Sequence, residues 1–243
     1  MILEFQKLLD ENEKIVFFTG AGISTESGIP DFRGPKGIWK TTQPIYFQDF
    51  IASEEKRLES WERKFSSDGT FASASPNIGH LKISEIMQKK QKAHLITQNV
   101  DNLHQDSGVD NSRITELHGN ATYAKCLECH LRYELDVLRD NFLRNKIPPI
   151  CDICGGFIKT ATISFGQPMP EEEMRIAQEK TLTCDLFISI GTSLLVFPAA
   201  GFPQLAKEVG AKLVIINNQP TDFDHIADLV ISEQIGEVFS AII

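Results

Sequence analysis

Four of the five cysteines form two pairs whose spacing suits the binding of one metal ion. The pairs are Cys126 and Cys129 in CLEC, and Cys151 and Cys154 in CDIC. Each C-x2-C pair can present two thiolates to one ion, and two pairs complete a tetrahedral Zn–S4 site. Because four protein ligands leave no position for water, the pattern predicts one structural Zn²⁺ per chain.

A redox dithiol and cysteines with no common role are the alternatives to zinc. Gly155 and Gly156 follow the second pair and suit the tight turn that such a site needs. His130 adjoins the first pair, but four cysteines already complete the ligand set. Cys184 opens an apolar run, so we expect it to be a small buried side chain.

A histidine and a glycine-rich turn are the other candidates for chemistry. His118 stands between a short apolar–polar segment and a glycine in ELHGN, where a histidine can act as a positioned general base. A purely structural histidine is the alternative. The turn at Gly20 and Gly22 departs from G-x-G-x-x-G, because Thr25 stands at the third glycine position and the next glycine is Gly28.

Short apolar runs and helical patterns alternate along the chain. Runs rich in Ile, Val and Phe that are apolar on both faces suit the buried strands of a parallel sheet. We expect strands at 15–18, 93–96, 186–190, 213–216 and 229–231, and helices over 47–65, after 75, after 170 and over 203–209. Pro76 suits the first turn of its helix. The alternation predicts an α/β fold with a parallel sheet.

Polar residues follow these runs, and open α/β sheets bind ligands beyond the carboxyl ends of their strands. Backbone N–H and hydroxyl groups there can contact phosphate, while amide and carboxylate groups can bind ribose. Each residue alone could be a turn or a helix cap, but together they favour a dinucleotide-binding crevice. They are Gly20, Ala21, Gly22, Gln98, Asn99, Asp101, Gly191, Thr192, Ser193, Asn217 and Asn218.

Composition and charge limit the class of protein. The chain has 243 residues and a net charge of −9, which argues against non-specific binding to nucleic acid. No apolar run approaches the roughly 20 residues of a membrane helix. The N-terminus has no basic segment ahead of an apolar one, so it does not read as a signal peptide. We therefore expect a cytoplasmic protein whose cysteines stay reduced.

Several motifs in one order carry a family resemblance. They are GAGISTESGIPDFRG, TQNVDNLHQDSG, ELHGN, the two C-x2-C pairs, FGQPMP and GTSLLVFPAA. The set resembles the sirtuin family, the NAD-dependent protein-lysine deacylases, over about residues 13–238. The resemblance implies a Rossmann-like NAD-binding domain (1–35, 76–120 and 160–243). A smaller domain would comprise the end of the cofactor loop with a helical insert (36–75) and a zinc-binding module (121–159).

The resemblance also assigns NAD⁺ contacts. Ile29, Asp31 and Asp101 match positions that hold the nicotinamide, Phe32 matches the aromatic over the reacting ribose carbon, and Arg33 matches a phosphate-side contact. Ile235 is a further match in the cofactor site. The loop at 24–39 would be a mobile lid over the ribose, with Gly28, Gly34 and Gly37 as hinge candidates.

The implied reaction transfers an acyl group from lysine to ADP-ribose and releases nicotinamide. His118 would be the general base on a ribose hydroxyl, while Asn99 and Gln98 would orient the ribose and a water molecule. An acyl-lysine peptide would add as a strand between Phe165, Gly166 and Gln167 on one side and Leu195 and Val196 on the other. A protein ADP-ribosyltransferase or NAD glycohydrolase using this site, and a non-catalytic NAD sensor, are the alternatives.

Three features depart from patterns within the family. Gln167 and Gln219 stand where glutamates are common, which puts in doubt the peptide charge preference and some ribose affinity. Members that prefer succinyl-lysine carry a Tyr-x-x-Arg pair, and this sequence has none. Trp61-Glu62-Arg63-Lys64 is its nearest imitation, so we expect neutral acyl groups to be preferred.

Overall fold

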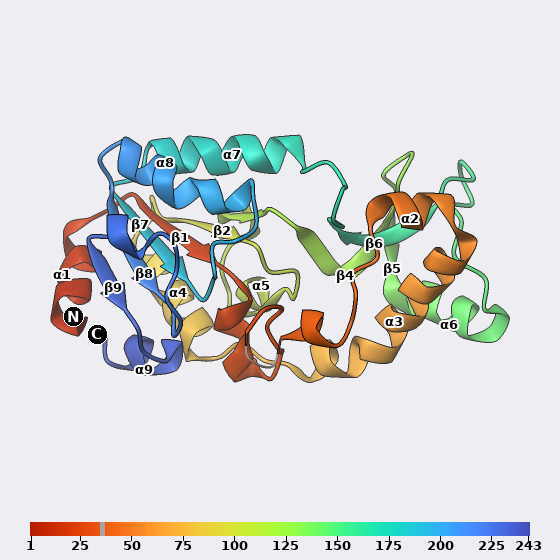
Figure 1. Ribbon diagram of the computed structural model, residues 1–243, viewed down its shortest axis with the longest axis horizontal. Coiled ribbons are helices and arrows are strands. Elements are labelled where there is room, and N and C mark those ends of the chain that lie inside the picture. The colour runs from red at the N-terminus through yellow and green to blue at the C-terminus, as the bar shows by residue number, and fades with distance from the viewer. Residues whose placement is uncertain (35–36) are drawn as a thin grey trace.

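The computed structural model describes residues 1–34 and 37–243, and a six-stranded parallel sheet forms its centre (Figure 1). The strand order is β3-β2-β1-β7-β8-β9. The bounds are β1 (Ile15–Thr19), β2 (His94–Thr97), β3 (Ile114–Glu116), β7 (Leu186–Ile190), β8 (Lys212–Ile216) and β9 (Leu229–Ile231). All five predicted strands are confirmed. The edge strand β3 was missed, because its residues Ile-Thr-Glu do not form an apolar run.

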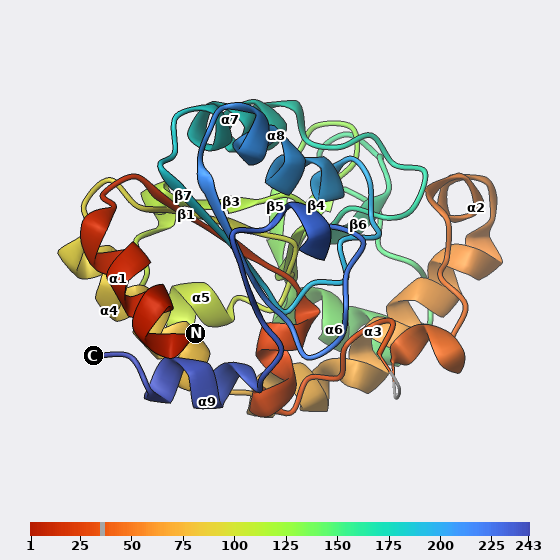
Figure 2. The same cartoon turned by 60° about the vertical axis from the view of Figure 1, so that its left-hand side comes forward.

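Helices cover both faces of this sheet (Figure 2). One face packs against α1 (Ile2–Glu11), α4 (Ile78–Lys89) and α9 (Ile235–Ser240), and the other against α7 (Glu171–Leu182) and α8 (Phe202–Glu208). Successive residues of β1 enter opposite faces, with Phe17 in the first core cluster and Phe18 in the second. This two-sided burial explains why the strand is apolar throughout.

The helix expectations need two corrections. Pro76 does not lie in the first turn of α4, because Asn77 is the N-cap and accepts the backbone N–H groups of Gly79 and His80. The helix expected over 47–65 is two helices, α2 (Phe47–Ala52) and α3 (Glu54–Ser73), separated at Ser53. α3 continues through the polar stretch after 65 that sequence reasoning had left outside the helix.

A smaller module lies beside the sheet domain, and Figure 1 shows it on the right. Its antiparallel sheet has the order β5-β4-β6, where β5 is Arg132–Glu134, β4 is Gly119–Cys126 and β6 is Ile158–Thr162. The helix α6 (Leu135–Asn145) directly follows β5. Trp61 of α3 and Phe142 of α6 share its core, so the helical insert and the cysteine-bearing segment pack as one body. Among the described residues, no helix is both long and apolar enough to span a membrane.

Candidate active-site cleft and zinc module

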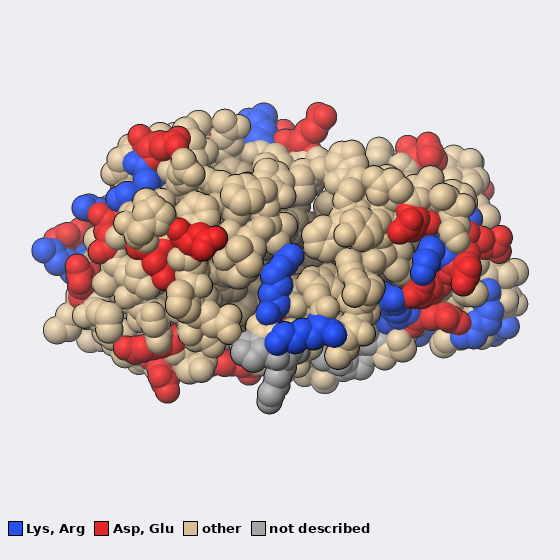
Figure 3. Space-filling model, in the orientation of Figure 1, with Lys and Arg blue, Asp and Glu red and all other residues tan. Residues whose placement is uncertain are grey.

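A cleft opens at the carboxyl ends of β1, β2, β7 and β8, beside the smaller module (Figure 3). Parallel strands bring these ends to one edge of the sheet, as the polar strand ends predict. Predicted residues that line the cleft are Gly20, Ala21, Gly22, Asp31, Phe32, Arg33, Gln98, Asn99, His118, Gly191, Thr192, Ser193, Val196, Asn217, Asn218 and Ile235. Ile29 and Asp101 do not line it.

Glu233 and Gln234 also line the cleft, although sequence reasoning had not placed them in the cofactor site. Gln219, expected near a ribose, and Thr25 and Gly34 of the predicted lid line it as well. Glu233 and Gln234 directly follow β9, so the polar-strand-end signal would have found them. Thr25 lies on the short helix after the glycine turn, at the position where G-x-G-x-x-G has its third glycine.

The glycine turn brings two strand ends into direct contact. The N–H of Gly22 donates to the carbonyl oxygen of Gly191 at 2.8 Å, and a Cβ on Gly22 would lie 2.7 Å from the Gly191 Cα. Only glycine fits this approach. A 3₁₀ helix over Ala21–Ser27 follows at once and ends at Gly28, whose φ is 87°. The first residues of the predicted lid, 24–27, therefore belong to a short helix.

The rest of the loop is tied down by aromatic and backbone contacts, although residues 35 and 36 lie outside the described residues. Phe32 stacks on Trp39 with ring centroids 5.1 Å apart, and the Trp39 N–H donates to the Phe32 carbonyl oxygen. Gly37 has an ordinary φ of −63°, and a Cβ there would lie 2.5 Å from the Phe32 carbonyl carbon. Gly37 thus permits close packing, while Gly28 alone of the hinge candidates adopts a left-handed conformation.

The imidazole of His118 has a defined orientation in the cleft. Its Nδ1 lies 3.0 Å from the carbonyl oxygen of Gln98. A carbonyl can only accept, so Nδ1 carries the proton and Nε2 is left as the basic nitrogen. Burial lowers the pKa of His118, the Gln98 hydrogen bond raises it, and the charge of Arg33 lowers it, for a net decrease. The ring is therefore neutral at pH 7.

Asn99 is held by a short polar chain. Its side-chain N–H donates to Ser24 Oγ at 3.2 Å, and that hydroxyl donates to Asp101 Oδ2 at 2.7 Å. Burial raises the pKa of Asp101, although the hydrogen bonds from Ser24 and from the backbone of Leu103 lower it in part. The side chain of Gln98 donates to Thr192 Oγ1 at 3.0 Å. Asp101 therefore supports the cleft from behind instead of facing it.

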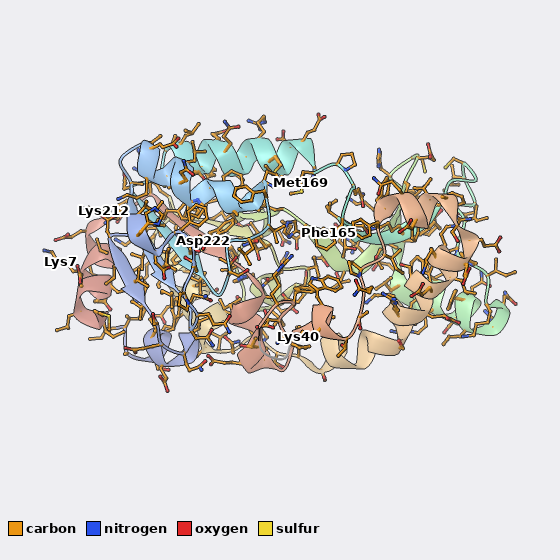
Figure 4. All side chains as sticks on the ribbon, in the orientation of Figure 1. Lys7, Lys40, Phe165, Met169, Lys212 and Asp222 are labelled. Carbon is orange, nitrogen blue, oxygen red and sulfur yellow. The ribbon has the colours of Figure 1, made fainter. Side chains whose placement is uncertain are left out.

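The expected peptide-binding residues lie where the module meets the sheet domain, and Figure 4 shows Phe165 there. Leu195 is 56% exposed, and Phe165 is flanked by the rings of Trp39 and Tyr46 at about 6 Å. The Phe165 carbonyl oxygen already accepts the N–H of Phe47. The side-chain oxygen of Gln167 accepts the N–H of Ser164 at 3.1 Å, so this side chain bonds within its own loop. Gly166, which has a positive φ, lies at the tip of that loop.

The four paired cysteines come together as expected. All four sulfur atoms lie within 4.8 Å of one another. The Cys126–Cys154 and Cys129–Cys151 separations are 3.4 and 3.7 Å, close to the edge of about 3.8 Å for a tetrahedron with Zn–S bonds of 2.3 Å. The donor set therefore fits a zinc ion. His130 is outside the cluster, and burial raises the pKa of Cys184 to about 12, as suits an unreactive thiol.

Comparisons with known proteins agree with this geometry. Residues 20–198 match the model of the Sir2 family. An NAD-dependent protein deacetylase of Rhodopseudomonas palustris is 56% identical over 223 residues, which cover 92% of this chain and 88% of that protein. A Sir2 structure with a p53 peptide and NAD⁺ has a TM-score of 0.85 and 33% identity, covering 99% of this chain and 96% of the other. Another Sir2 structure holds a deacetylated p53 peptide and 3′-O-acetyl ADP ribose, with a TM-score of 0.88, 33% identity and the same coverage.

Proposed function

The chain belongs to the Sir2 family, and we propose that it is an NAD-dependent protein-lysine deacylase in which His118 is the general base and Asn99 orients the ribose. The observation that carries this proposal is the orientation of His118. Its Nδ1–H is held by the backbone of Gln98, so a neutral ring presents Nε2 as a base. A histidine kept for structure alone does not need a free basic nitrogen in a cleft.

The cleft residues divide between the two ends of NAD⁺. Ala21, Gly22 and the 191–193 turn would contact the phosphates, Asn217 and Asn218 the adenosine ribose, and Phe32 the reacting ribose. NAD⁺ supplies an electrophilic ribose carbon, from which nicotinamide departs, and a ribose hydroxyl that takes up the acyl group. The Phe32–Trp39 stack would exclude water from that carbon, because water would divert the reaction to hydrolysis.

Ile29 and Asp101 would act at the nicotinamide end through the residues around them. Ile29 is buried and precedes the cleft-lining loop, and Asp101 accepts the hydroxyl that Asn99 contacts. Arg33 lines the cleft, and its charge depresses the pKa of His118. It would therefore both contact phosphate and help to keep the base neutral.

An acyl-lysine protein or peptide would be the second substrate. A peptide strand would lie between the loop at Gly166 and Leu195, which is exposed, while Val196 lines the cleft. Backbone pairing of this kind gives affinity with little demand on sequence. The four cysteines would hold a structural Zn²⁺ that stabilises the module and supplies no chemistry to the cleft.

The deciding experiment is incubation with NAD⁺ and a panel of acyl-lysine peptides, with products identified by mass spectrometry. A deacylase gives free lysine, nicotinamide and O-acyl-ADP-ribose. Peptide carrying ADP-ribose would support a transferase, free ADP-ribose a glycohydrolase, and no nicotinamide a non-catalytic sensor. We place the enzyme in the cytoplasm, where its five cysteines, none of them in a disulfide, would stay reduced.

A further inference from the structure

Three buried polar atoms behind the cleft have no hydrogen-bond partner among the described residues. They are His80 Nε2, His104 Nδ1 and Ser84 Oγ. His80 and Ser84 lie one turn apart on α4, while His104 lies on α5 (Leu103–Asp106), and the two imidazole centroids are 4.8 Å apart. A buried polar group without a partner costs about 1–3 kcal/mol, so three at one interface need an explanation.

The proton of His80 can be placed from its surroundings. The backbone N–H of Asn77 donates to His80 Nδ1 at 3.3 Å, so Nδ1 is an acceptor and carries no proton. Burial lowers the pKa of His80 to about 4, which keeps the ring neutral at pH 7. Its one N–H is therefore on Nε2, a buried donor that faces no acceptor.

The proton of His104 follows in the same way. Thr19 Oγ1 donates its single proton to Thr97 Oγ1 at 2.8 Å, so it can only accept from His104 Nε2 at 2.9 Å. Burial holds the pKa of His104 well below its usual value, so this ring is neutral as well. Its Nδ1 is therefore a buried acceptor that lacks a donor, next to a buried donor that lacks an acceptor.

We propose that His80 Nε2–H donates to His104 Nδ1, directly or through one buried water that also contacts Ser84 Oγ, and that this histidine pair positions Asn99 for the proposed deacylation. The link to Asn99 runs through Thr97. Thr97 Oγ1, which accepts from Thr19, also accepts the backbone N–H of Asn99 at 3.0 Å.

Both ends of this series of hydrogen bonds contact the cofactor loop. The side chain of Asn77 donates to the carbonyl oxygen of Ile23 at 2.7 Å, and the side chain of Asn99 donates to Ser24 Oγ. The polar chain therefore starts and ends on the same 3₁₀ helix, Ala21–Ser27. It contacts that helix at Ile23 and Ser24 and so fixes Asn99 relative to it. His80, His104 and Thr97 are positioning residues, since none of them lines the cleft.

The histidine tautomers test the proposal without any assay of activity. In ¹⁵N-labelled, zinc-loaded full-length protein, long-range ¹H–¹⁵N spectra at pH 7 should show both rings neutral, with the proton on Nε2 in each. An Nδ1–H tautomer or a charged ring at either histidine would overturn the proposal. This result does not depend on which reaction the enzyme catalyses, so it stands apart from a failure of the proposed function.

Replacement of Thr97 tests the positioning role. Thr97→Val removes the acceptor of the Asn99 N–H at nearly constant volume, and it should lower kcat about tenfold, speed hydrogen exchange of the Asn99 amide, and leave the KM for NAD⁺ within about twofold. Thr97→Ser keeps the hydroxyl and should restore kcat and exchange. The matched control is Thr115→Val, because Thr115 is also buried and contacts a histidine, His94, but takes no part in the series of hydrogen bonds from His80 to Asn99. An unchanged Thr97→Val, or an equal effect of Thr115→Val, would refute the role.

Discussion

His118 Nδ1 and the carbonyl oxygen of Gln98 lie 3.0 Å apart, and this one hydrogen bond determines which nitrogen of the imidazole is basic. The carbonyl belongs to the same segment that carries Asn99, so the base and the group expected to orient the ribose are positioned together. Burial and Arg33 together depress the pKa of the ring more than the Gln98 bond raises it. The imidazole is therefore neutral at pH 7, and its Nε2 is free to accept a proton.

The first prediction concerns the loss of this base. His118→Ala should lower kcat by roughly 10²–10⁴-fold, the usual contribution of a general base. NAD⁺ binding, measured by calorimetry, should be retained because the remaining lining of the cleft is intact. His225→Ala is the control, since His225 is an exposed histidine outside the cleft and its replacement should change neither quantity. Near-normal turnover by His118→Ala would rule out the assignment.

The second prediction concerns the acid limb of the rate profile. The base works only when unprotonated, and its pKa is below the ordinary 6.5. The acid limb of kcat/KM for a peptide should therefore be centred below pH 6.5. Arg33→Gln removes the positive charge that disfavours protonation of His118, so it should move the acid limb to higher pH. A limb centred above pH 7 would contradict the environment seen around His118.

The third prediction concerns the metal. Metal analysis should find one zinc per chain, and Cys154→Ser should lose it together with the folding of the module and, indirectly, with activity, because metal-binding energy is folding energy in such sites. Cys184→Ser is the control, since Cys184 is a buried cysteine that lies outside the cluster. Active protein without zinc would show that the cysteines serve another purpose.

The fourth prediction concerns the acyl group. Trp61 is buried in the core of the module, and Arg63 already donates to the carbonyl oxygen of Gln43 and pairs with Glu59. Neither is available to clamp a carboxylate, and burying a carboxylate without a cationic partner is costly. Acetyl or longer neutral acyl-lysine should exceed succinyl-lysine in kcat/KM by at least about tenfold, or ~1.4 kcal/mol.

Side-by-side kinetics on one peptide sequence with each acyl group would measure this ratio. Arg63→Gln should leave the ratio unchanged, because the guanidinium is committed within the helical insert. A preference for succinyl-lysine that disappears in Arg63→Gln would show that this arginine does reach the pocket.

The fifth prediction concerns stability in acid. Burial lowers the pKa values of His80 and His94 to about 4, and it holds that of His104 well below its usual value. Between pH 6.5 and 4 the unfolded chain thus binds more protons at these residues than the folded chain, so stability falls as pH falls. Each histidine should contribute a slope approaching about 1.4 kcal/mol per pH unit in the free energy of unfolding.

Urea unfolding at several pH values would measure the total slope. His94→Gln should reduce the slope by the contribution of about one proton, or about 1.4 kcal/mol per pH unit. His225→Gln, at an exposed site, should not reduce it. The raised pKa values of Asp101 and Glu116 act with the opposite sign at the acid end of this window, because the folded state there holds protons that the unfolded state has released. A slope unaffected by His94→Gln would contradict the buried, neutral state of that ring.

The sequence by itself was enough for those features that depend on residue type and local spacing. The zinc ligands follow from two C-x2-C pairs, and β1, β2, β7, β8 and β9 follow from apolar runs whose burial on both faces requires them to be apolar throughout. The edge of the sheet where the cleft lies follows from parallel strand direction. Each of these inferences needs only neighbours along the chain.

The tertiary structure decided what depends on contacts between distant segments. The close approach of Gly22 to Gly191 and the bond from His118 to Gln98 join residues that no local pattern relates. The place of Asp101 behind the cleft was likewise invisible, because a carboxylate after a strand can face either way. The polar chain through His80 and His104 is the clearest case. Nothing in the local sequence distinguishes these two histidines. Only the packing of α4 on α5 excludes water from them and so determines where their protons lie.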